Sequence, residues 1–154
     1  HVTGPFQNLP AICKVAGSFT RRIRSVMIIG GSNIARYLLR ILDRAGMDIC
    51  VIERDRAIAE SLAGEFSGVK VIIGDGTDQS LLEEQHIESY DCLIALTGID
   101  EENLITSLYA AKKKVPKIVT KVNRTQLLHV LGDTRLQTIV TPKRRASETM
   151  TCGG

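Results

Sequence analysis

The strongest constraint on the fold is a regular alternation, beginning at Ile23, between short apolar runs and amphipathic segments. The apolar runs lie at 26–29, 49–52, 69–73, 92–96, 118–122 and 138–140. They are continuous rather than alternating with polar residues, which is typical of strands buried on both faces. Six such strands separated by helices predict a doubly wound α/β fold. We expect a parallel six-stranded sheet in the order 3-2-1-4-5-6, with helices on both faces and right-handed crossovers.

Helical periodicity marks the segments between the strands. The apolar stripes are Ile34, Tyr37, Leu38, Ile41 and Leu42; Ile58, Leu62 and Phe66; Leu104, Ile105, Leu108 and Ala111; and Leu127, Leu128 and Leu131. Gly46 is placed to end the first helix, and Asp55 to cap the second. Asn123 and Gln126 resemble a capping box before the last helix, and Pro116 is placed to open the fifth strand.

The composition is that of one soluble globular domain. The 154 residues are 44% hydrophobic and 24% charged, and the net charge of +3 is too small to argue for nucleic acid by itself. We expect residues 23–142 to form the domain. Residues 1–22 are interpreted as a linker or expression remnant with a possible short helix, and 143–154 as a tail leading to a missing domain.

The cysteines and the hydropathy bear on the compartment. Cys13, Cys50, Cys92 and Cys152 form no C-x-x-C pair and have no metal-ligand spacing with histidine. Reduced, buried thiols in a reducing compartment are therefore expected for the two in apolar runs. No apolar stretch approaches the roughly 20 residues that span a bilayer, so a function at a membrane would require a partner.

The most informative motif follows the first apolar run. It places Gly30, Ser32 and Ala35 at the three small-residue positions of a G-x-G-x-x-G/A phosphate-binding turn, with Gly31 adding local freedom. The second position is normally glycine. The Ser32 hydroxyl could donate a hydrogen bond to a phosphate, or the side chain could crowd a pyrophosphate. Free N–H groups at the helix N-terminus favour retained binding.

A carboxylate follows at the expected distance. Glu53 lies 23 residues after Gly30, at the end of the second apolar run, where a carboxylate accepts hydrogen bonds from ribose hydroxyls. It would repel a 2′-phosphate, so NAD is preferred over NADP. Arg54 could offset that repulsion or lie over the adenine.

Two further strand ends supply candidate residues. After the third run, Asp75 could accept a hydrogen bond from an adenine amino group or a ribose, while Thr77 or Asp78 could equally cap the next helix. After the fourth run, Thr97 and Gly98 would face the phosphates or the nicotinamide ribose. The acidic residues at 100–102 are expected to serve the positive end of their own helix.

Together these segments resemble a known family. The runs RSVMIIGGSNIA, VIERD, GDGTD, ALTGIDEENL and TKVN are similar to the regulator-of-potassium-conductance (RCK/KTN, TrkA N-terminal type) family, especially the second half of the NAD-binding component of Trk potassium uptake. The resemblance implies a Rossmann-type domain without enzymatic activity that binds NAD(H), or ATP, ADP or AMP in some branches. It also implies dimers that build a ring on the cytoplasmic side of a membrane-embedded potassium transporter or channel, which nucleotide exchange would gate.

The resemblance also implies which residues bind the cofactor. Matched position by position, these are Gly30, Ser32, Asn33, Ile34, Glu53, Arg54, Asp75, Gly76, Thr97, Gly98 and Lys121. With Gly31 and Thr77 from the same turns, they make up the predicted nucleotide site. We predict no catalytic residue and no metal ligand.

Other classes of function share parts of this pattern. Tyr109 and Lys113 have the Y-x-x-x-K spacing of short-chain dehydrogenases, but they fall on an ordinary amphipathic helix. An NAD(P)-dependent oxidoreductase would also need a substrate-holding domain. A nucleotide-dependent transcription regulator needs a basic recognition face, whereas the basic residues here are scattered. A methyltransferase that binds S-adenosylmethionine would share the turn and the acid, and it is an alternative that ligand titration would separate.

Overall fold

Six parallel strands form one sheet in the computed structural model, which describes residues 23–124 and 137–140. The order is β3-β2-β1-β4-β5-β6, as the sequence predicts. The strands are β1 (Ser25–Ile29), β2 (Asp48–Glu53), β3 (Lys70–Ile73), β4 (Cys92–Ala95), β5 (Lys117–Val122) and β6 (Gln137–Val140). The helices are α2 (Asn33–Arg44), α3 (Arg56–Glu65), α4 (Gln79–Glu84), the short 3₁₀ helix η2 (Ile87–Ser89) and α5 (Asp100–Lys112).

Several sequence predictions fall outside the described residues. They are the possible short helix before residue 23, the helix predicted from the leucines at 127–131, the Gln126 half of the capping box, and the tail at 143–154.

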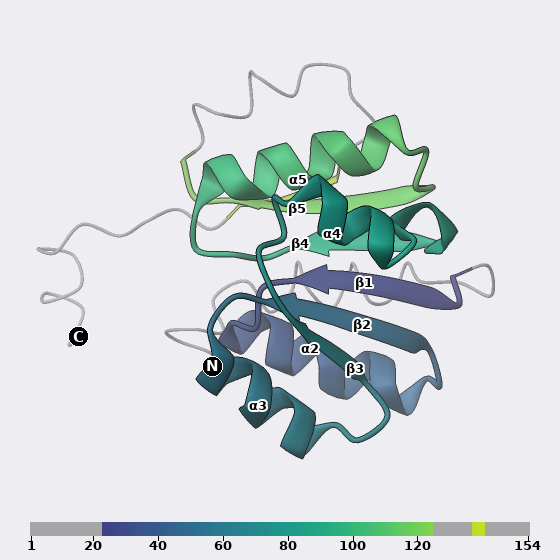
Figure 1. Cartoon of the computed structure of the whole chain (residues 1–154), viewed down its shortest axis with the longest axis vertical. Coiled ribbons are helices and arrows are strands. Elements are labelled where there is room, and N and C mark those ends of the chain that lie inside the picture. Colours follow the sequence, from purple (N-terminus) through teal and green to yellow (C-terminus); the bar gives the residue numbers. More distant parts are fainter. Residues whose placement is uncertain (1–22, 125–136, 141–154) are drawn as a thin grey trace, which may run out of the picture.

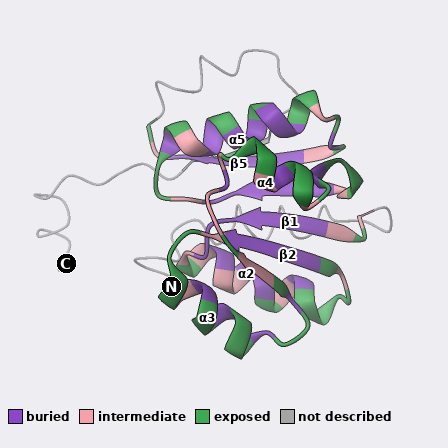
Figure 2. Ribbon diagram, in the orientation of Figure 1, coloured by how far each residue is buried: buried purple, intermediate pink, exposed green. Residues whose placement is uncertain are grey.

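Strand β1 lies at the centre of the sheet and separates two apolar cores. Val26 and Ile28 face the side covered by α2 and α3, while Met27 and Ile29 face the side covered by α4 and α5. Figure 1 shows these helix layers, and Figure 2 shows the buried strands between them. All four side chains are at most 2% exposed. The continuous apolar run therefore reflects a strand with a core on each face.

Polar caps begin the helices where the sequence indicates. The Asp55 carboxylate accepts from the N–H groups of Ala57 and Ile58 at 2.8 and 3.2 Å, which confirms it as the cap of α3. Asp78 caps α4 in the same way through the N–H of Ser80. Gly46, with φ of +75°, follows the end of α2, as predicted. These caps satisfy N–H groups that have no partner inside the helix.

The buried face of α5 differs from the predicted apolar stripe. Ile105 and Leu108 are 50% and 43% exposed, whereas the buried positions include Asn103, Thr106 and Ser107. The hydrogen bonds explain the difference: Thr106 donates to the carbonyl of Gly76 at 2.9 Å, and Ser107 bonds with Thr120 of β5. Short polar side chains with satisfied hydrogen bonds can be buried at little cost. The stripe predicted from hydrophobic periodicity is therefore confirmed at Leu104, which is 7% exposed, and wrong at Ile105, Leu108 and Ala111, which are exposed.

The buried stripe of α2 is also rotated from the predicted one. The fully buried positions are Ala35, Leu38, Leu39 and Leu42, while Ile34, Tyr37 and Ile41 are half-buried. Leu38 and Leu42 confirm part of the predicted stripe, and Ile34 and Tyr37 pack against the same core. The prediction left out Ala35 and Leu39, which are fully buried.

The two described cysteines should be protected from alkylation. Cys50 and Cys92 are free and buried, and burial raises the pKa of both thiols, that of Cys92 to about 12. Because the thiolate is the reactive form, we expect iodoacetamide at pH 8 to label Cys92 at least about 100-fold more slowly in the folded chain than in denaturing urea. Peptide-level mass spectrometry measures the rates, and similar rates in both states would contradict this burial.

Candidate functional site

A cleft of about 260 Å³ opens at the carboxyl ends of β1, β2 and β4. In a sheet of this order, the strand connections on the two sides of β1 run in opposite directions, which leaves a crevice at this edge. Eight predicted site residues line it: Gly30, Gly31, Ser32, Glu53, Arg54, Gly76, Thr97 and Gly98. The lining also includes Ile29, Ile52, Ile58, Gly74, Leu96 and Glu102.

The turn between β1 and α2 requires its two glycines. Gly30 has φ of +101°, and a Cβ there would lie 3.0 Å from the backbone nitrogen of Thr97. A Cβ at Gly31 would lie 2.7 and 2.8 Å from side-chain carbons of Leu62 and Ile58 on α3. The first glycine is therefore fixed by its backbone conformation and by the backbone that follows β4. The second is fixed by packing against α3.

Ser32 fits the turn without strain. Its φ of −64° and ψ of 175° are ordinary for a residue with a side chain, and its hydroxyl accepts from the N–H of Ala35 at 3.3 Å. Ser32 is therefore the N-cap of α2, a role that neither sequence interpretation included. The first N–H groups of a helix have no partner inside the helix. In α2 these include the N–H groups of Asn33 and Ile34, which precede the Ala35 N–H that Ser32 satisfies.

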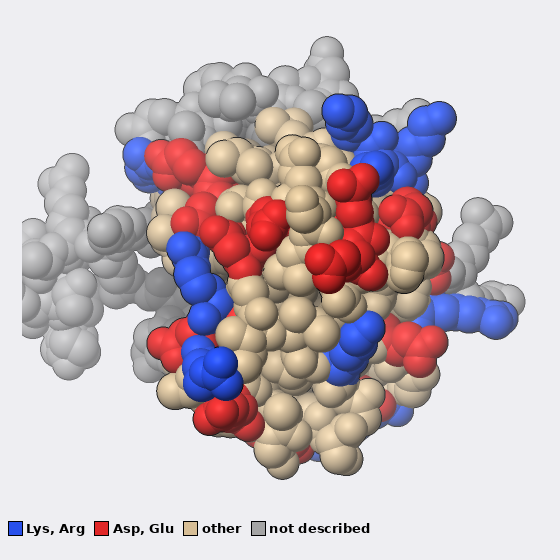
Figure 3. Space-filling view, viewed as in Figure 1, with Lys and Arg blue, Asp and Glu red and all other residues tan. Residues whose placement is uncertain are grey.

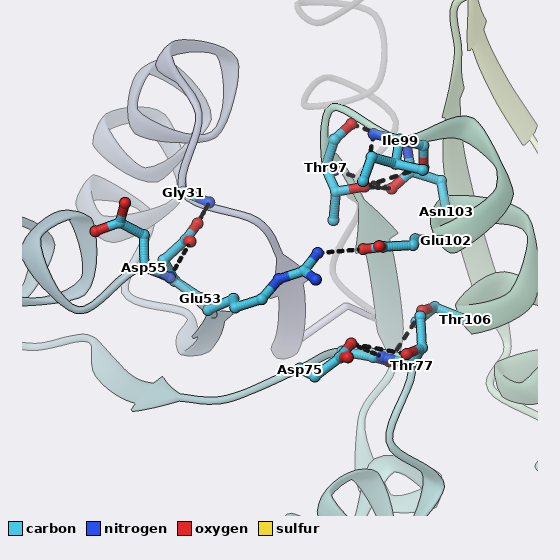
Figure 4. A network of polar contacts seen from close by, with 12 residues as sticks. Gly31, Glu53, Asp55, Asp75, Thr77, Thr97, Ile99, Glu102, Asn103 and Thr106 are labelled. Atoms are coloured by element: carbon cyan, nitrogen blue, oxygen red, sulfur yellow. Dashed lines mark hydrogen bonds and ion pairs between the residues drawn. The ribbon is translucent and has the colours of Figure 1, made fainter.

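Glu53 joins the end of β2 to the glycine turn. One carboxylate oxygen accepts from the N–H of Gly31 at 2.6 Å, and the other accepts from the N–H of Asp55 at 2.7 Å. Figure 4 shows Glu53 between these two residues. A carboxylate can accept about four hydrogen bonds, so these two bonds leave about two acceptor positions unused. The predicted acid therefore also positions the predicted turn.

The opposite rim of the cleft is held by Asn103, which is fully buried. Its carbonyl accepts from the N–H and hydroxyl of Thr97 at 2.9 and 2.8 Å. Its amide donates to the carbonyls of Thr97 and Lys121, both at 3.0 Å. One side chain thus connects the loop after β4 to the end of β5.

The two rims meet in an ion pair. Arg54, at the end of β2, reaches Glu102 in the first turn of α5 at 2.6 Å. The other acids of that turn have different partners: Asp100 accepts from the backbone N–H groups of Asn123 and Arg124, and Glu101 pairs with the Arg124 side chain. The three acids were expected only to serve the helix terminus, whereas each makes a specific contact.

Five predicted site residues do not line the cleft. Asp75 accepts from the N–H and hydroxyl of Thr77 at 2.8 and 2.7 Å, and these bonds lower the pKa of its carboxyl, with a smaller contribution from Arg54. Asn33 and Ile34 lie at the start of α2. Lys121 is 9% exposed on β5, where burial lowers its pKa against the opposing effect of Asp100.

Two residues of the site were not predicted from the sequence. Glu102 was assigned to its own helix, and Asn103 was given no role. The only sequence signal for Asn103 is its position immediately before the predicted apolar stripe, which begins at Leu104. Glu102 has no such signal, because its partner is 48 residues away.

The features of other protein classes lie elsewhere in the structure. Lys113 lies over the Tyr109 ring and pairs with Glu83 at 3.4 Å, and neither Tyr109 nor Lys113 lines the cleft. Acidic and basic side chains are interspersed on the face shown in Figure 3. The described part of the chain contains no cluster of three potential metal ligands. None of its helices combines the length and apolarity needed to cross a membrane.

The fold and the cleft define a Rossmann-type α/β domain. It is similar to the TrkA-N domain of the inner membrane protein ybaL from Escherichia coli, with a TM-score of 0.68 and 16% identity over 87% of this chain and 98% of that one. It is also similar to the Kef C-terminal domain of Shewanella denitrificans in its AMP-bound form, with a TM-score of 0.60 and 22% identity over 85% of this chain and 77% of that one.

The family follows from the sequence itself. The sequence model of the TrkA-N domain family matches residues 26–142, and the chain belongs to that family. Its relatives include the Trk system potassium uptake protein TrkA of Haemophilus influenzae, 29% identical over 90% of this chain, and TrkA homologs of Methanothermobacter thermautotrophicus and Pyrococcus abyssi, 30% and 38% identical over 79% and 62% of it. The matches cover 30%, 56% and 41% of these three relatives.

The packing of the glycine turn is testable by substitution. We expect Gly31→Ala to lower the free energy of unfolding by about 1–3 kcal/mol, because the added methyl overpacks against Leu62 and Ile58. The matched control is Gly64→Ala in α3, where a Cβ meets nothing within 4 Å. That change should stabilise by about 0.5–1 kcal/mol. Urea denaturation measures both, and equal effects would contradict the turn geometry.

The role of Asn103 is a separate prediction. Asn103→Ala removes the partners of the Thr97 N–H and the Lys121 carbonyl, and should lower the free energy of unfolding by about 2–3 kcal/mol. Asn33→Ala is the control, since Asn33 is exposed, and should cost under about 0.5 kcal/mol. Thermal unfolding of the two variants compares them, and a loss no larger than the control's would rule out the proposed connection between β4 and β5.

Proposed function

We propose that the cleft binds an adenine nucleotide, NAD(H) in the first instance, and that the domain is a regulatory part of a potassium uptake system. The observation that carries this proposal is the Glu53 carboxylate, which lines the cleft and accepts the N–H of Gly31 in the phosphate-type turn at 2.6 Å. This hydrogen bond brings the candidate acceptor for ribose, Glu53, into contact with the candidate phosphate-binding turn.

The start of α2 supports a phosphate at the turn. Gly30, Gly31 and Ser32 line the cleft, and the first N–H groups of α2 follow them. A helix N-terminus attracts anions through these N–H groups and through the helix dipole. Because Ser32 is unstrained as the N-cap, its side chain does not prevent this use. Asn33 and Ile34 would then contribute backbone N–H groups rather than side chains.

The Glu53 carboxylate at the end of β2 favours the binding of a ribose and disfavours a 2′-phosphate. Two acceptor positions of the Glu53 carboxylate are not used by Gly31 and Asp55, and ribose hydroxyls are suitable donors. Thr97 and Gly98 lie across the cleft and would contact the distal half of a dinucleotide. The other predicted residues, Asp75, Thr77 and Lys121, would act on the ligand only indirectly, by supporting the rims.

The names of the relatives support a regulatory role beside a membrane protein. We infer that the domain performs no chemistry of its own and works on the cytoplasmic face of the membrane with a potassium transporter or channel subunit. A ring of dimers would convert nucleotide exchange into a change of pore state. Such coupling requires ligands that bind two assembly states with different affinity. Nucleic acid is not a partner in this proposal.

Ligand-dependent stabilisation tests the proposal. We expect NADH at about 100 times its dissociation constant to add about 2.7 kcal/mol to the free energy of unfolding, and so to raise the melting temperature by several degrees. NAD, NADPH, ATP, ADP, AMP and S-adenosylmethionine are compared in the same assay. AMP is included because it is the ligand named for the Shewanella Kef domain. No shift with any nucleotide would refute nucleotide binding by this chain.

A pair of variants assigns the site. Glu53→Gln should weaken NADH binding about tenfold, because a charge-assisted hydrogen bond to ribose becomes a neutral one and because the amide NH2 cannot accept from one of the two backbone N–H groups that the carboxylate holds. The control, Asp55→Asn, makes the same chemical change at the same strand end, but Asp55 does not line the cleft and Asn caps a helix equally well. Titration calorimetry measures both, and equal losses would place the ligand elsewhere.

A further inference from the structure

The Arg54–Glu102 ion pair crosses the mouth of the cleft. Arg54 belongs to the rim formed by β2, and Glu102 to the rim formed by β4 and α5; both residues line the cleft. The side chains are 56% and 22% exposed, so the pair lies at the opening rather than inside a core. Its guanidinium–carboxylate distance of 2.6 Å is that of a direct contact between charged groups.

This pair determines the charge of the cleft. Among the described residues, the charged side chains that line it are Glu53, Glu102 and Arg54. Arg54, the cation among them, is neutralised by Glu102, and Glu53 remains as an uncompensated acid. The attraction for an anionic ligand therefore depends on backbone N–H groups at the turn after β1. Two acids and one cation leave the lining with a net negative charge, which a ligand with additional phosphate groups would meet.

Glu102 also acts on its own helix. Asp100, Glu101 and Glu102 occupy the first turn of α5, where the helix dipole would otherwise attract anions. Asp100 and Glu101 are engaged by Arg124 and by backbone N–H groups on the side of β5. Glu102 is the acid of this turn that lines the cleft. The start of α5 is therefore unfavourable for phosphate, in contrast to the start of α2.

We propose that Glu102 is a specificity-determining residue that holds Arg54 across the cleft and selects against nucleotides with extra phosphate charge. The ligand favoured is an adenine dinucleotide, and the ligands that Glu102 excludes are nucleoside triphosphates, whereas a 2′-phosphate is disfavoured by Glu53. Removing the Glu102 charge removes a direct repulsion and releases the Arg54 guanidinium to bind phosphate. This inference rests on the nucleotide site proposed above and names the residue that sets its selectivity.

The test compares the dissociation constants of NADH and ATP for the 154-residue chain. We expect Glu102→Gln to tighten ATP binding about five- to tenfold while changing NADH binding less than about twofold, since one partly exposed charge has been removed near the additional phosphates. The matched control is Glu101→Gln, which makes the same change one residue earlier, at an acid that pairs with Arg124 and does not line the cleft. It should leave the ATP-to-NADH ratio unchanged.

The same substitution in an Arg54→Gln variant separates the repulsion of phosphate by Glu102 from the release of the Arg54 guanidinium. In Arg54→Gln chains, the further change Glu102→Gln should improve ATP binding by less than half as much on a logarithmic scale, because no guanidinium is released. An unchanged ratio in Glu102→Gln, or an equal change in Glu101→Gln, would overturn the role of Glu102 while leaving the nucleotide site intact. If the wild-type chain binds neither NADH nor ATP, the site itself is refuted, and the inference with it. Melting temperatures confirm that each variant is folded.

Discussion

The geometry of the cleft depends on the hydrogen bond between the Gly31 N–H and the Glu53 carboxylate. It fixes the turn after β1 against the end of β2, and the same carboxylate fixes the N–H that precedes α3. The bond is possible only because a Gly31 without a side chain can approach Leu62 and Ile58. One backbone contact thereby places the candidate phosphate and ribose groups on a common edge.

On the opposite rim, a buried side-chain amide takes the place of the carboxylate. Asn103 forms hydrogen bonds with the backbone N–H and carbonyl of Thr97 and with the carbonyl of Lys121. The polar face of α5 also bonds through Thr106 to the carbonyl of Gly76, in the loop after β3, and through Ser107 to Thr120 of β5. Because every one of these groups has a partner, the helix can leave Ile105 and Leu108 exposed and still be firmly attached.

The sequence predicts the fold more completely than the site. Continuous apolar runs that alternate with helical segments predict a doubly wound sheet, and the usual order of that fold gives the strand order. Asp55 marks the start of α3 and Gly46 the end of α2, because capping depends on local sequence. The glycine turn and Glu53 are likewise local motifs. The buried face of α5 is not predictable in this way, because hydrogen bonds to the distant Gly76 and Thr120 outweigh hydrophobicity there. The pairing of Arg54 with Glu102 also depends on how two distant segments meet in the folded sheet.

Both rims are already bonded to the sheet in the chain alone, and this has a consequence for the thermodynamics of association. A loop that becomes ordered only on binding loses conformational entropy, and that loss is subtracted from the affinity. Here Glu53 orders one rim and Asn103 the other through contacts within the chain. A molecule entering the cleft would therefore meet preorganised walls, and the Arg54 side chain, more than half exposed, is the group whose freedom it would chiefly change.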